Sequence, residues 1–551
     1  MSGTKPATDP QDFARRDFLA ATSTSLAALS VLAAGCSESA PPATSAAERE
    51  SAPRAPFDSI RDYVTALEAH GLLLRIPRID QDQYLSTALM FRIVDKFGMF
   101  GAPALMFENI KIDGQWMQGP VVANLQGHWN ADCIVWGLET VSGDWFATYR
   151  RAKAHLARML EANNGSYPLI PPVEVAPDAA PCKEVVLTGD EIDLYAFPFM
   201  KTNPADGGRY VNTGSVFTSD PQFGNNFGTY RCQITGPRSM KIHSSTVHVG
   251  YKTWTAARER GEDTAPVSVV IGQDPVVWML SGAPVARRPN DTGPIDELAM
   301  AGGMRGAALK VVKSETNELI IPAHAEMVIE GEMLLQAPLV REGPFGEMFG
   351  YLGPEMENVF TMKVTKVTHR RNPWIMNSYT GMHRGFITAP MEALYDNLLR
   401  KLVPELVEFH YPQNMMGVAF LSIDKTAPGQ GLEAGRKIAN RIPIVKTVVV
   451  VDKDVNVLDP VEMLFTVGSR WQPYPATEII EDSRGIMADP SAPVPWRTSK
   501  AVIDATKQWP EEGGPESYAE LNRDLLEKGA PRAFDLVDEQ FGALLSDWRR
   551  V

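Results

Sequence analysis

The stretch "LIIPAHAEMVIEGEM", residues 319–333, decides the fold of the middle of the chain. Its apolar residues come in short runs or alternate with polar ones, which is typical of β-strands. Segments of the same kind, separated by turn-forming residues, lie at 211–220, 229–235, 241–249, 266–272 and 360–370. Several such strands in succession predict a β-barrel or a folded sheet over residues 183–388.

The part of the chain before this region mixes helices and strands. Apolar residues recur at helical spacing from Asp58 until Gly71, and the amphipathic stretch 144–165 ends in Asn-Asn-Gly. Between these helices, 102–110 and 119–127 have the pattern of strands. Residues 57–182 are therefore expected to form an N-terminal α/β region, which ends in a proline-rich boundary.

The part after the central strands changes character again. Residues 389–410 predict a linker helix. Strand, helix and strand patterns then follow one another at 417–424, 435–442 and 446–455, which is the signal for an α/β domain. Residues 411–551 are expected to form this C-terminal domain, with two further helices near the end of the chain.

Composition excludes several classes of protein. The chain has 551 residues and a formal charge of −14, so it is long enough for several domains. The acidic balance argues against a nucleic-acid partner, because phosphate recognition needs clustered Lys and Arg. The four cysteines form no CxxC pair, and the sequence contains no Walker A loop, GxSxG elbow or HExxH motif.

The N-terminus resembles an export signal of the twin-arginine type. Arg15 and Arg16 precede a short, mildly apolar run that ends at Cys36. Residues 1–36 are therefore expected to direct the protein to the periplasm or cell envelope, with residues 37–56 as a flexible tether. "LAAGC" also resembles a lipobox that would lipidate Cys36, although Leu32 stands one position too far back. A chance basic terminus and a membrane anchor are the alternatives, and the run is short for a bilayer span.

The stretch "EGPFGE" holds two carboxylates on a tight bend. Glu342 and Glu347 are five residues apart, so they share neither a helix face nor a strand face. Pro344 fixes its own φ, whereas Gly343 and Gly346 permit unusual backbone angles. The bend can therefore bring an acid and a base to one point, where two close carboxylates disfavour double ionisation. The alternative is an ordinary solvated turn.

Seven stretches occur in an order that resembles the UbiD-type decarboxylases, the family of the polyprenyl-hydroxybenzoate and ferulic acid decarboxylases. They are "APALMFENI", "GGRYVNTGSVFT", "NFGTYR", "VSVVIGQDP", "DELAMAGGMRG", "IPAHAEMVIEG" and "EGPFGEMFGY". The resemblance covers about residues 58 to 505. It implies an α+β or α/β fold with a flavin-reductase-like split barrel, a linker helix and a C-terminal oligomerisation domain.

The same resemblance implies the reaction and its cofactors. Family members remove CO₂ from aromatic or α,β-unsaturated acids with prenylated FMN, a divalent metal that is usually manganese, and often potassium. A separate flavin prenyltransferase makes the cofactor inside the cell. Removing CO₂ leaves an unstable carbanion, and side chains cannot provide the electron sink that it needs. A homodimer or higher homo-oligomer is expected.

Three residues fall on catalytic positions of the family. Arg231, in "NNFGTYR", falls on the catalytic arginine, and Arg suits recognition of a planar carboxylate. Glu342 falls on its charged partner, and Glu347 on the proton donor. From composition alone, Arg231 would be interpreted as part of a surface salt bridge.

Three residues fall on metal-ligand positions. These are Asn226, His248 and Glu297, which together offer an amide oxygen, an imidazole and a carboxylate. This mixture suits Mn²⁺ or Mg²⁺ better than Zn²⁺. His248 has two alternatives, since His243 lies nearby and a buried core histidine is common.

The remaining predicted cofactor contacts lie in four short stretches. They are Asn226, Thr229, Tyr230, Arg231, Ser244, Ser245, Thr246, His248, Ser281, Gly282, Ala283, Pro284 and Lys437. A solvated helix face is an equal alternative for Lys437.

The leading hypothesis is an exported decarboxylase that acts on a small carboxylic acid, with carboxylation possible in reverse. An exported flavin- or ligand-binding lipoprotein is the first alternative, although a binder has no need of a proton donor. A flavin reductase is the second, because fold does not fix function. His383 and Arg384 lie where the family has its substrate loop. They are expected either to bind a second polar group of the substrate or to be exposed.

Overall fold

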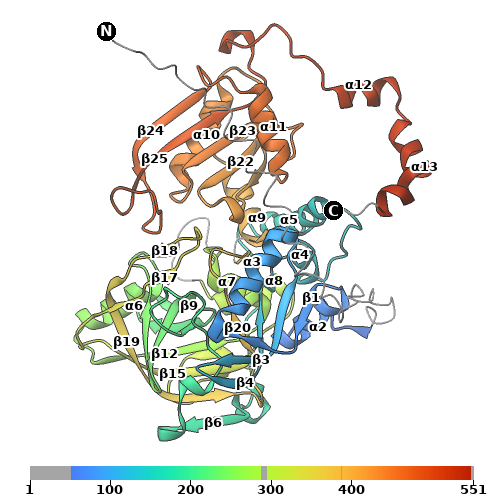
Figure 1. Ribbon diagram of the computed structural model, residues 1–551. Helices are drawn as coiled ribbons and strands as arrows, with labels where there is room; N and C mark the ends of the chain where they lie inside the picture. Colours follow the sequence, from blue (N-terminus) through green and yellow to red (C-terminus); the bar gives the residue numbers. More distant parts are fainter. Residues whose placement is uncertain (1–50, 287–294, 386–387, 548–551) are drawn as a thin grey trace, which may run out of the picture.

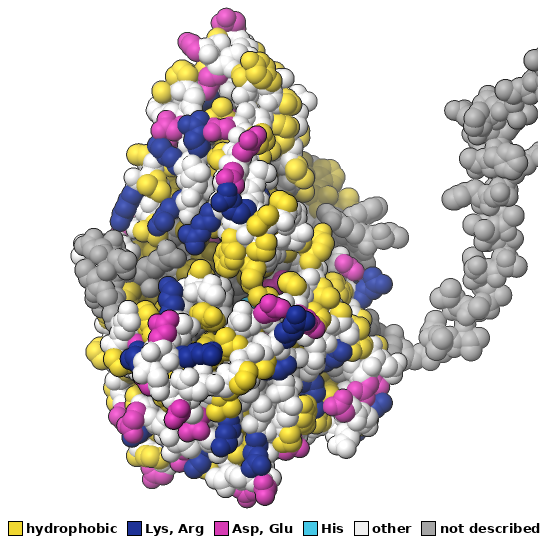
Figure 2. All heavy atoms as spheres, turned by 90° about the vertical axis from the view of Figure 1, so that its left-hand side faces the viewer, with side chains coloured by type: hydrophobic (Ala, Val, Ile, Leu, Met, Phe, Trp, Pro, Cys, Tyr) yellow, Lys and Arg dark blue, Asp and Glu magenta, His cyan; other side chains and the backbone are white. Residues whose placement is uncertain are grey.

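The computed structural model describes residues 51–286, 295–385 and 388–547. The expected export signal and the lipobox cysteine Cys36 lie outside these residues. The described chain forms two lobes, with the C-terminal lobe above a larger lobe built from all the preceding elements (Figure 1). Figure 2 shows both lobes from another side, with Lys and Arg side chains gathered on the C-terminal lobe beside the boundary.

The N-terminal region is a small mixed sheet with helices packed around it. Strand order is β1-β3-β4-β20, with β2 beside β3. The elements are α2 (Ile60–Ala69), β1 (Leu73–Ile76), β2 (Ile79–Asp80), α3 (Leu85–Phe97), β3 (Ala104–Ile112), β4 (Gln115–Ala123), α4 (Asn130–Ile134), α5 (Trp145–Ala162) and β20 (Ile375–Asn377). Because β20 comes from far along the chain and pairs with β4, this sheet crosses the boundary expected at residue 182.

The central region is a curled half-barrel sheet, as the strand-rich sequence predicts. Its path is β7-β10-β11-β19-β15-β12-β8-β9, and β6 and β16 both pair with β19. The strands are β6 (Val185–Thr188), β7 (Tyr210–Val211), β8 (Ser215–Asp220), β9 (Gly224–Thr229), β10 (Arg231–Gly236), β11 (Ser239–His243), β12 (Thr264–Ile271), β15 (Met327–Leu334), β16 (Val340–Glu342) and β19 (Met356–His369). Apolar side chains from these strands and from the N-terminal sheet form one buried cluster.

The opening stretch, 319–333, supplies strands to two different sheets. Its first part is β14 (Ile320–Pro322), which pairs with β13 (Lys310–Lys313), and its second part is β15. β5 (Val173–Glu174) completes the smaller sheet. Glu326, in the short connection, is fully buried and receives Nε and Nη2 of Arg61 at 2.8 and 2.6 Å. This ion pair ties the first helix to the half-barrel.

The predicted strand at 241–249 is only half correct. β11 ends at His243, and residues 244–248 form the turn that leads into α6 (Val249–Glu259). β11 pairs with β10 as far as His243 and with β19 as far as Ile242, and beyond these residues it has no strand to pair with among the described residues. Among the described residues of this region, the other α-helices are α7 (Pro275–Gly282) and α8 (Glu297–Arg305), which pack against each other.

The linker helix is shorter than expected. α9 covers Ala389–Leu399, and residues 406–410 form strand β21 (Leu406–His410) instead. The prediction of a helix through residue 410 is wrong because Pro404 disfavours helical backbone in the residue before it. The apolar residues that follow then pair with β22.

Buried charges hold α9 in place. Lys153 of α5 pairs with Asp396 at 3.0 Å and lies 3.5 Å from Glu392, both on α9. Glu392 also accepts a hydrogen bond from His410 Nδ1 at 2.8 Å. Since buried charges are costly unless paired, this network fixes the linker against both lobes.

The C-terminal lobe is an α/β domain with strand order β21-β22-β23-β25-β24. Its other elements are β22 (Val418–Ile423), α10 (Gln430–Arg441), β23 (Thr447–Asp452), α11 (Pro460–Arg470), β24 (Thr477–Arg484) and β25 (Arg497–Asp504). Two last helices, α12 (Asn522–Gly529) and α13 (Ala533–Asp547), extend away from the lobe as an arm (Figure 1). The arm exposes apolar side chains, including Leu525, Phe541 and Leu544.

Within the described residues, no helix is long and apolar enough to cross a bilayer. Cys133, Cys182 and Cys232 are buried and unpaired, so no disulfide links the described parts of the chain.

The tight contact between β15 and β19 generates the first prediction. A Cβ added at Gly331 would lie 2.1 Å from the carbonyl oxygen of Lys363. Gly331→Ala is expected to destabilise the protein by about 1–3 kcal/mol, because two paired strands must move apart. Gly236→Ala is the control, since its nearest neighbour would be 3.8 Å away. Urea unfolding measures both variants, and equal stabilities would contradict the prediction.

Candidate active site

An arginine between two glutamates forms the centre of the candidate active site. Arg231, the first residue of β10, donates from Nε and Nη2 to Glu342, with Nη2 2.8 Å from Oε2. Its Nη1 donates to Glu347 Oε1 at 2.5 Å. Arg231 and Glu342 are buried, and the Glu347 side chain is 22% exposed. One guanidinium therefore holds both carboxylates, one inside the protein and one at its edge.

The bend at 342–347 produces this convergence. Glu342 ends β16, the two-residue strand β17 (Phe345–Gly346) follows, and β17 pairs with β18 (Leu352–Gly353). Gly343 has a φ of 100°, which L-residues with side chains rarely adopt. The chain therefore reverses within two residues of Glu342, and Glu347 returns to the same arginine, as the spacing predicts.

The two carboxylates occupy different environments. Burial raises the pKa of Glu347 above its ordinary value, Arg231 lowers it, and the negative charge of Glu342 raises it again. The net direction is upward, so Glu347 keeps its proton at a higher pH than a free glutamate does. Glu342 instead has two hydrogen-bonding nitrogens of Arg231 against it. The pair is thus suited to one protonated and one ionised carboxyl group.

A second polar cluster surrounds Glu297 at the start of α8. Its Oε2 accepts from the Asn226 side-chain amide at 3.0 Å and from the Phe227 backbone N–H at 2.9 Å. Burial raises the pKa of Glu297 to about 8, although both donors lower it. A small cavity of about 160 Å³ is lined by Asn226, Phe227 and Glu297 together with neighbouring apolar residues.

These residues fit a divalent metal by their chemistry. The carboxylate of Glu297 has two neutral donors, so a cation would supply the positive charge that balances it. His248 lies apart from this contact and stacks on Tyr230, with ring centroids 5.6 Å apart. Within the described ranges, no three His, Cys, Asp or Glu side chains cluster as metal ligands. The expected ligand set contains only two residues of these types, His248 and Glu297, because its third member is an asparagine. The structure brings Asn226 and Glu297 together, and the role of His248 stays a prediction.

The expected cofactor contacts lie at the ends of neighbouring elements. Thr229 ends β9 and its hydroxyl is 2.7 Å from that of Ser281, near the end of α7. The Tyr230 hydroxyl accepts from the Gly250 N–H at 3.2 Å. The other expected contacts are the turn residues Ser244, Ser245 and Thr246, and the residues Gly282, Ala283 and Pro284 at and beyond the end of α7. Since β9 runs directly into β10, this group joins the Glu297 cluster to Arg231.

Lys437 lies in the other lobe. It is on α10 and forms an ion pair with Glu433 one turn earlier, at 2.7 Å. Its side chain is 38% exposed, as the alternative of a solvated helix face requires. A contact with a cofactor phosphate stays a prediction.

His383 and Arg384 are not exposed. Arg384 is 1% exposed and forms a buried ion pair with Asp132, and its guanidinium lies 5.1 Å from the ring centre of Tyr149. His383 hydrogen-bonds the Arg384 carbonyl through Nδ1 at 2.7 Å. The expectation of exposed loop residues is wrong, because the loop folds back onto the N-terminal helices. The ion pair of Arg384 with Asp132 anchors this loop to the N-terminal region.

Sequence reasoning gave no role to Tyr210. Its O–H donates to Glu342 Oε1 at 2.8 Å, and its ring packs 4.5 Å from that of Phe345. Tyr210 is inside the quoted stretch "GGRYVNTGSVFT", but its partner is 132 residues away. No local pattern reveals a contact of that separation.

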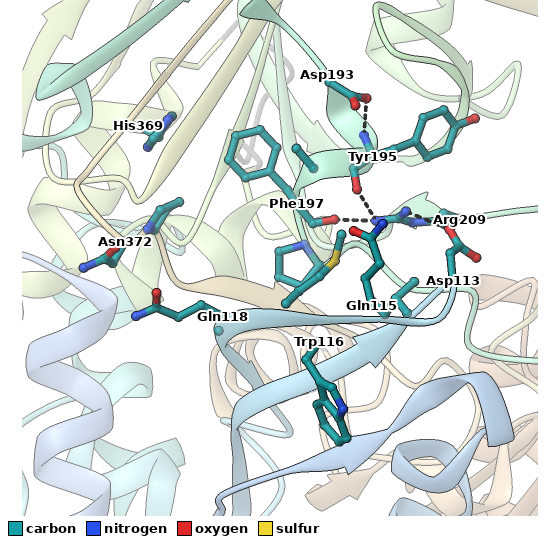
Figure 3. A pocket seen from close by; sticks show the side chains of 16 residues that line it. Asp113, Gln115, Trp116, Gln118, Asp193, Tyr195, Phe197, Arg209, His369 and Asn372 are labelled. Atoms are coloured by element: carbon teal, nitrogen blue, oxygen red, sulfur yellow. Dashed lines mark hydrogen bonds and ion pairs between the residues drawn. The ribbon is translucent and has the colours of Figure 1, made fainter.

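A separate cavity lies between the β3–β4 hairpin and residues 193–198 (Figure 3). Its volume is about 680 Å³, and none of the expected site residues lines it. Figure 3 shows Arg209 at its edge, bonded to the Tyr195 and Phe197 carbonyls and paired with Asp113 at 3.1 Å. Because the Arg209 guanidinium is already bonded to backbone carbonyls and to Asp113, it is a weak binding group for an anionic ligand in this cavity.

The site is thus a buried arginine between two glutamates, held on the curled half-barrel of a mixed α/β fold. Residues 173–383 match the Rift-related domain of 3-octaprenyl-4-hydroxybenzoate carboxy-lyase, and residues 385–505 match its C-terminal domain. A relative from Archaeoglobus fulgidus is 30% identical over 468 residues, covering 83% of this chain and 93% of the relative. The chain belongs to the UbiD family.

Solved structures are similar over almost the whole chain. The open form of vanillic acid decarboxylase from Sedimentibacter hydroxybenzoicus is 26% identical with a TM-score of 0.73, covering 89% of this chain and all of that one. The UbiD-class enzyme HmfF from Pelotomaculum thermopropionicum, in complex with FMN, is 27% identical with a TM-score of 0.70. That match covers 84% of this chain and 97% of HmfF. An evolved dimeric form of HmfF with prenylated FMN is 26% identical with a TM-score of 0.67, covering 86% of this chain and 98% of that one.

The anchoring role of Arg384 generates a prediction. Arg384→Met is expected to destabilise the protein by about 3–5 kcal/mol, because Asp132 is left buried and unpaired. Combining it with Asp132→Leu should restore part of the loss. Arg371→Met, at an exposed position, is the control and should change stability by less than about 0.5 kcal/mol. Urea unfolding reports the result. Wild-type stability of the single variant would argue against an anchor.

Proposed function

We propose that the protein is a reversible, non-oxidative decarboxylase of an aromatic, heteroaromatic or α,β-unsaturated carboxylic acid, using prenylated FMN and a divalent metal. The single observation that carries this proposal is the convergence of Glu342 and Glu347 on Arg231. Such a reaction needs a proton at the carbon that loses CO₂. The protein has a partly exposed carboxyl group with a raised pKa beside a fixed positive charge. A flavin-binding lipoprotein has no use for this arrangement.

The side chains have distinct roles in this proposal. When bound, prenylated FMN supplies the electron sink that stabilises the developing carbanion. Arg231 holds Glu342 in its ionised form and orients Glu347 through Nη1. Glu347 delivers its proton from the carboxyl oxygen to the substrate carbon. It must therefore be protonated before the step, and turnover is expected to fall as pH rises through the raised pKa of Glu347.

The cofactor site is proposed from residues that fit by chemistry. Asn226, His248 and Glu297 would hold Mn²⁺ or Mg²⁺, with the flavin phosphate balancing the remaining charge. Thr229 and Tyr230 would contact the flavin through their backbone, the loop from Ser281 would line it, and K⁺ would accompany the phosphate. Complexes of HmfF with FMN and prenylated FMN support a flavin in this fold. A flavin prenyltransferase would supply the cofactor before export.

The substrate is proposed to be an aromatic acid first of all. The similar structure at 26% identity is a vanillic acid decarboxylase, and it supports this class. The direct test uses protein co-expressed with a flavin prenyltransferase and Mn²⁺. The released flavin is identified by mass spectrometry, bound metal is measured, and CO₂ release is followed with aromatic, heteroaromatic and cinnamic acids. Ordinary FMN or no flavin under these conditions would argue against the proposal, and would favour a binding protein or a flavin reductase.

Replacing the proton donor is expected to slow turnover far more than substrate binding. Glu347→Gln should lower kcat by ~10²–10⁴-fold with little change in KM, because the amide cannot deliver a proton. Glu357→Gln is the matched control, since Glu357 is exposed and pairs only with Arg341 among the described residues. Steady-state kinetics on reconstituted holoenzyme measure both variants. A kcat within threefold (roughly) of wild type for Glu347→Gln would assign the proton to another group.

Oligomerisation through the C-terminal lobe is part of the proposal. Helix α11 exposes Val461, Leu464 and Phe465 on one side, and the arm formed by α12 and α13 is largely exposed. Unpartnered amphipathic helices favour burial against another chain. A homodimer or higher homo-oligomer would bury these faces. Light scattering measures the molecular mass in solution, and a monomer at micromolar concentration would contradict the proposed oligomerisation.

We also propose export by the twin-arginine pathway, which carries folded proteins and so allows loading with cofactor beforehand. The support is the signal-like sequence around Arg15 and Arg16. A lipid on Cys36 would then anchor the protein.

Replacing Arg15 and Arg16 by lysines is expected to trap holoenzyme in the cytoplasm, because the paired arginines are the recognised part of such a signal. Cell fractionation followed by immunoblotting measures the distribution. Arg54→Lys, beyond the signal, is the control and should leave export unchanged. Periplasmic holoenzyme with the paired lysines would refute this route.

A further inference from the structure

Tyr210 is a fourth side chain at the cluster of Arg231, Glu342 and Glu347, and its hydroxyl points at Glu342. Tyr210 is in β7 and is 1% exposed. Its O–H lies 2.8 Å from Glu342 Oε1, on the carboxylate that also receives Arg231. We propose that Tyr210 is a positioning residue of this site: it holds Glu342 ionised against Arg231, so that the proton shared by the two carboxylates stays on Glu347.

The ring of Tyr210 is part of the same assembly. It lies against Phe345, with centroids 4.5 Å apart, and Phe345 lies 5.2 Å beneath the guanidinium of Arg231. Tyr210, Phe345 and Arg231 therefore form a continuous stack beside the bend. A cation over an aromatic face gains further attraction, which stabilises the guanidinium in this position.

The residues before Tyr210 hold the backbone of the bend. Gly207 donates its N–H to the Pro344 carbonyl at 2.7 Å, and Asp206 Oδ1 accepts the Gly346 N–H at 3.1 Å. A Cβ at Gly207 would lie 2.2 Å from the Gly343 carbonyl oxygen, so only glycine permits this approach. The segment 206–210 thus holds the bend through hydrogen bonds to its backbone and through the hydrogen bond from Tyr210 to Glu342.

The charges around the pair explain what the hydroxyl does. Burial raises the pKa of Tyr210, as does the negative charge of Glu342, so the phenol keeps its proton and acts as a donor. His243 faces Arg231 across β10 and β11, and burial together with Arg231 lowers its pKa to about 3, so it is neutral. Asp206 uses its carboxylate on Thr202, Asn203 and Gly346. Cys232 is buried, and burial raises its pKa so that it remains a thiol.

Within the part of the chain that the structure describes, two side chains donate hydrogen bonds to Glu342, namely those of Arg231 and Tyr210. Arg231 is shared with Glu347, so it favours ionisation of both carboxylates. Tyr210 bonds Glu342 alone. The phenol is consequently a donor that stabilises the charge of Glu342 and not that of Glu347.

The inference rests on the proposed function for its catalytic meaning, but its test also has a readout on the protein without cofactor. Infrared difference spectra are recorded during a pH titration, and Glu342→Gln and Glu347→Gln variants assign the protonated carboxyl band. When Tyr210 is retained, the protonated carboxyl band is expected to disappear with Glu347→Gln and to persist with Glu342→Gln. With Tyr210→Phe, protonation of the pair should move up by about one pH unit, because a hydrogen bond to a charged group is lost. When Tyr210→Phe is combined with Glu347→Gln, part of the protonated carboxyl band should remain, because some of the proton then resides on Glu342.

The second readout is kinetic. In holoenzyme with Tyr210→Phe, the pH above which kcat falls should also move up by about one unit, with KM nearly unchanged. Tyr167→Phe is the matched control: Tyr167 is 2% exposed and donates to the Pro390 carbonyl at 2.6 Å, far along the chain from the bend. It should lose stability similarly but leave both titrations in place.

A second variant guards against misfolding of Tyr210→Phe. A ring-fluorinated tyrosine at position 210 keeps the ring and donates a stronger hydrogen bond, so the titration should move in the opposite direction. Unchanged infrared titrations in both variants would overturn the inference, as would equal shifts in the Tyr167→Phe control. A shifted titration in a protein without decarboxylase activity would uphold the positioning role and reject the proposed function.

Discussion

The ion pair between Arg231 and Glu342 is the interaction on which the rest of the site depends. Both side chains are buried, and a buried charge without a partner is strongly destabilising. The pair therefore fixes the first strand residue of β10 against the last residue of β16. The bend, Glu347 and the segment around Tyr210 are all arranged around this contact, and Glu347 reaches the protein edge while still bonded to the same guanidinium.

The half-barrel provides the rigid frame for this contact. β10 pairs with β11, β11 pairs with β19, and β19 carries β16, so three successive ladders set the distance between Arg231 and Glu342. The same sheet path continues through β15, β12 and β8 to β9, which contributes Asn226 and Phe227 to the Glu297 cluster. A site held by strands is more precise than one on mobile loops. The two polar clusters therefore keep a fixed relation through a continuous sheet.

Much of this arrangement could be predicted from residue patterns. The alternating segments predicted the half-barrel strands, and the spacing in "EGPFGE" predicted that two carboxylates meet on a bend. The linker helix was too long because Pro404 and the pairing of β21 with β22 ended it. Arg384 was expected at the surface or on a substrate, and it pairs instead with Asp132 from a distant helix. The first failure arises from a neighbouring strand and a proline within the predicted helix, and the second from a partner 252 positions away in the chain.

The order of residues was sufficient to determine the classes of element, the bend and the residue types needed for acid–base chemistry, because these depend on local periodicity and backbone preference. Folding in three dimensions decided which carboxylate is buried, which remains at the edge and which phenol bonds only one of them. Those differences arise from desolvation and from hydrogen bonds between residues more than a hundred positions apart, such as Tyr210 with Glu342 and Arg231 with Glu347. Neither effect leaves a local pattern in the chain, because both depend on how the half-barrel closes around the arginine.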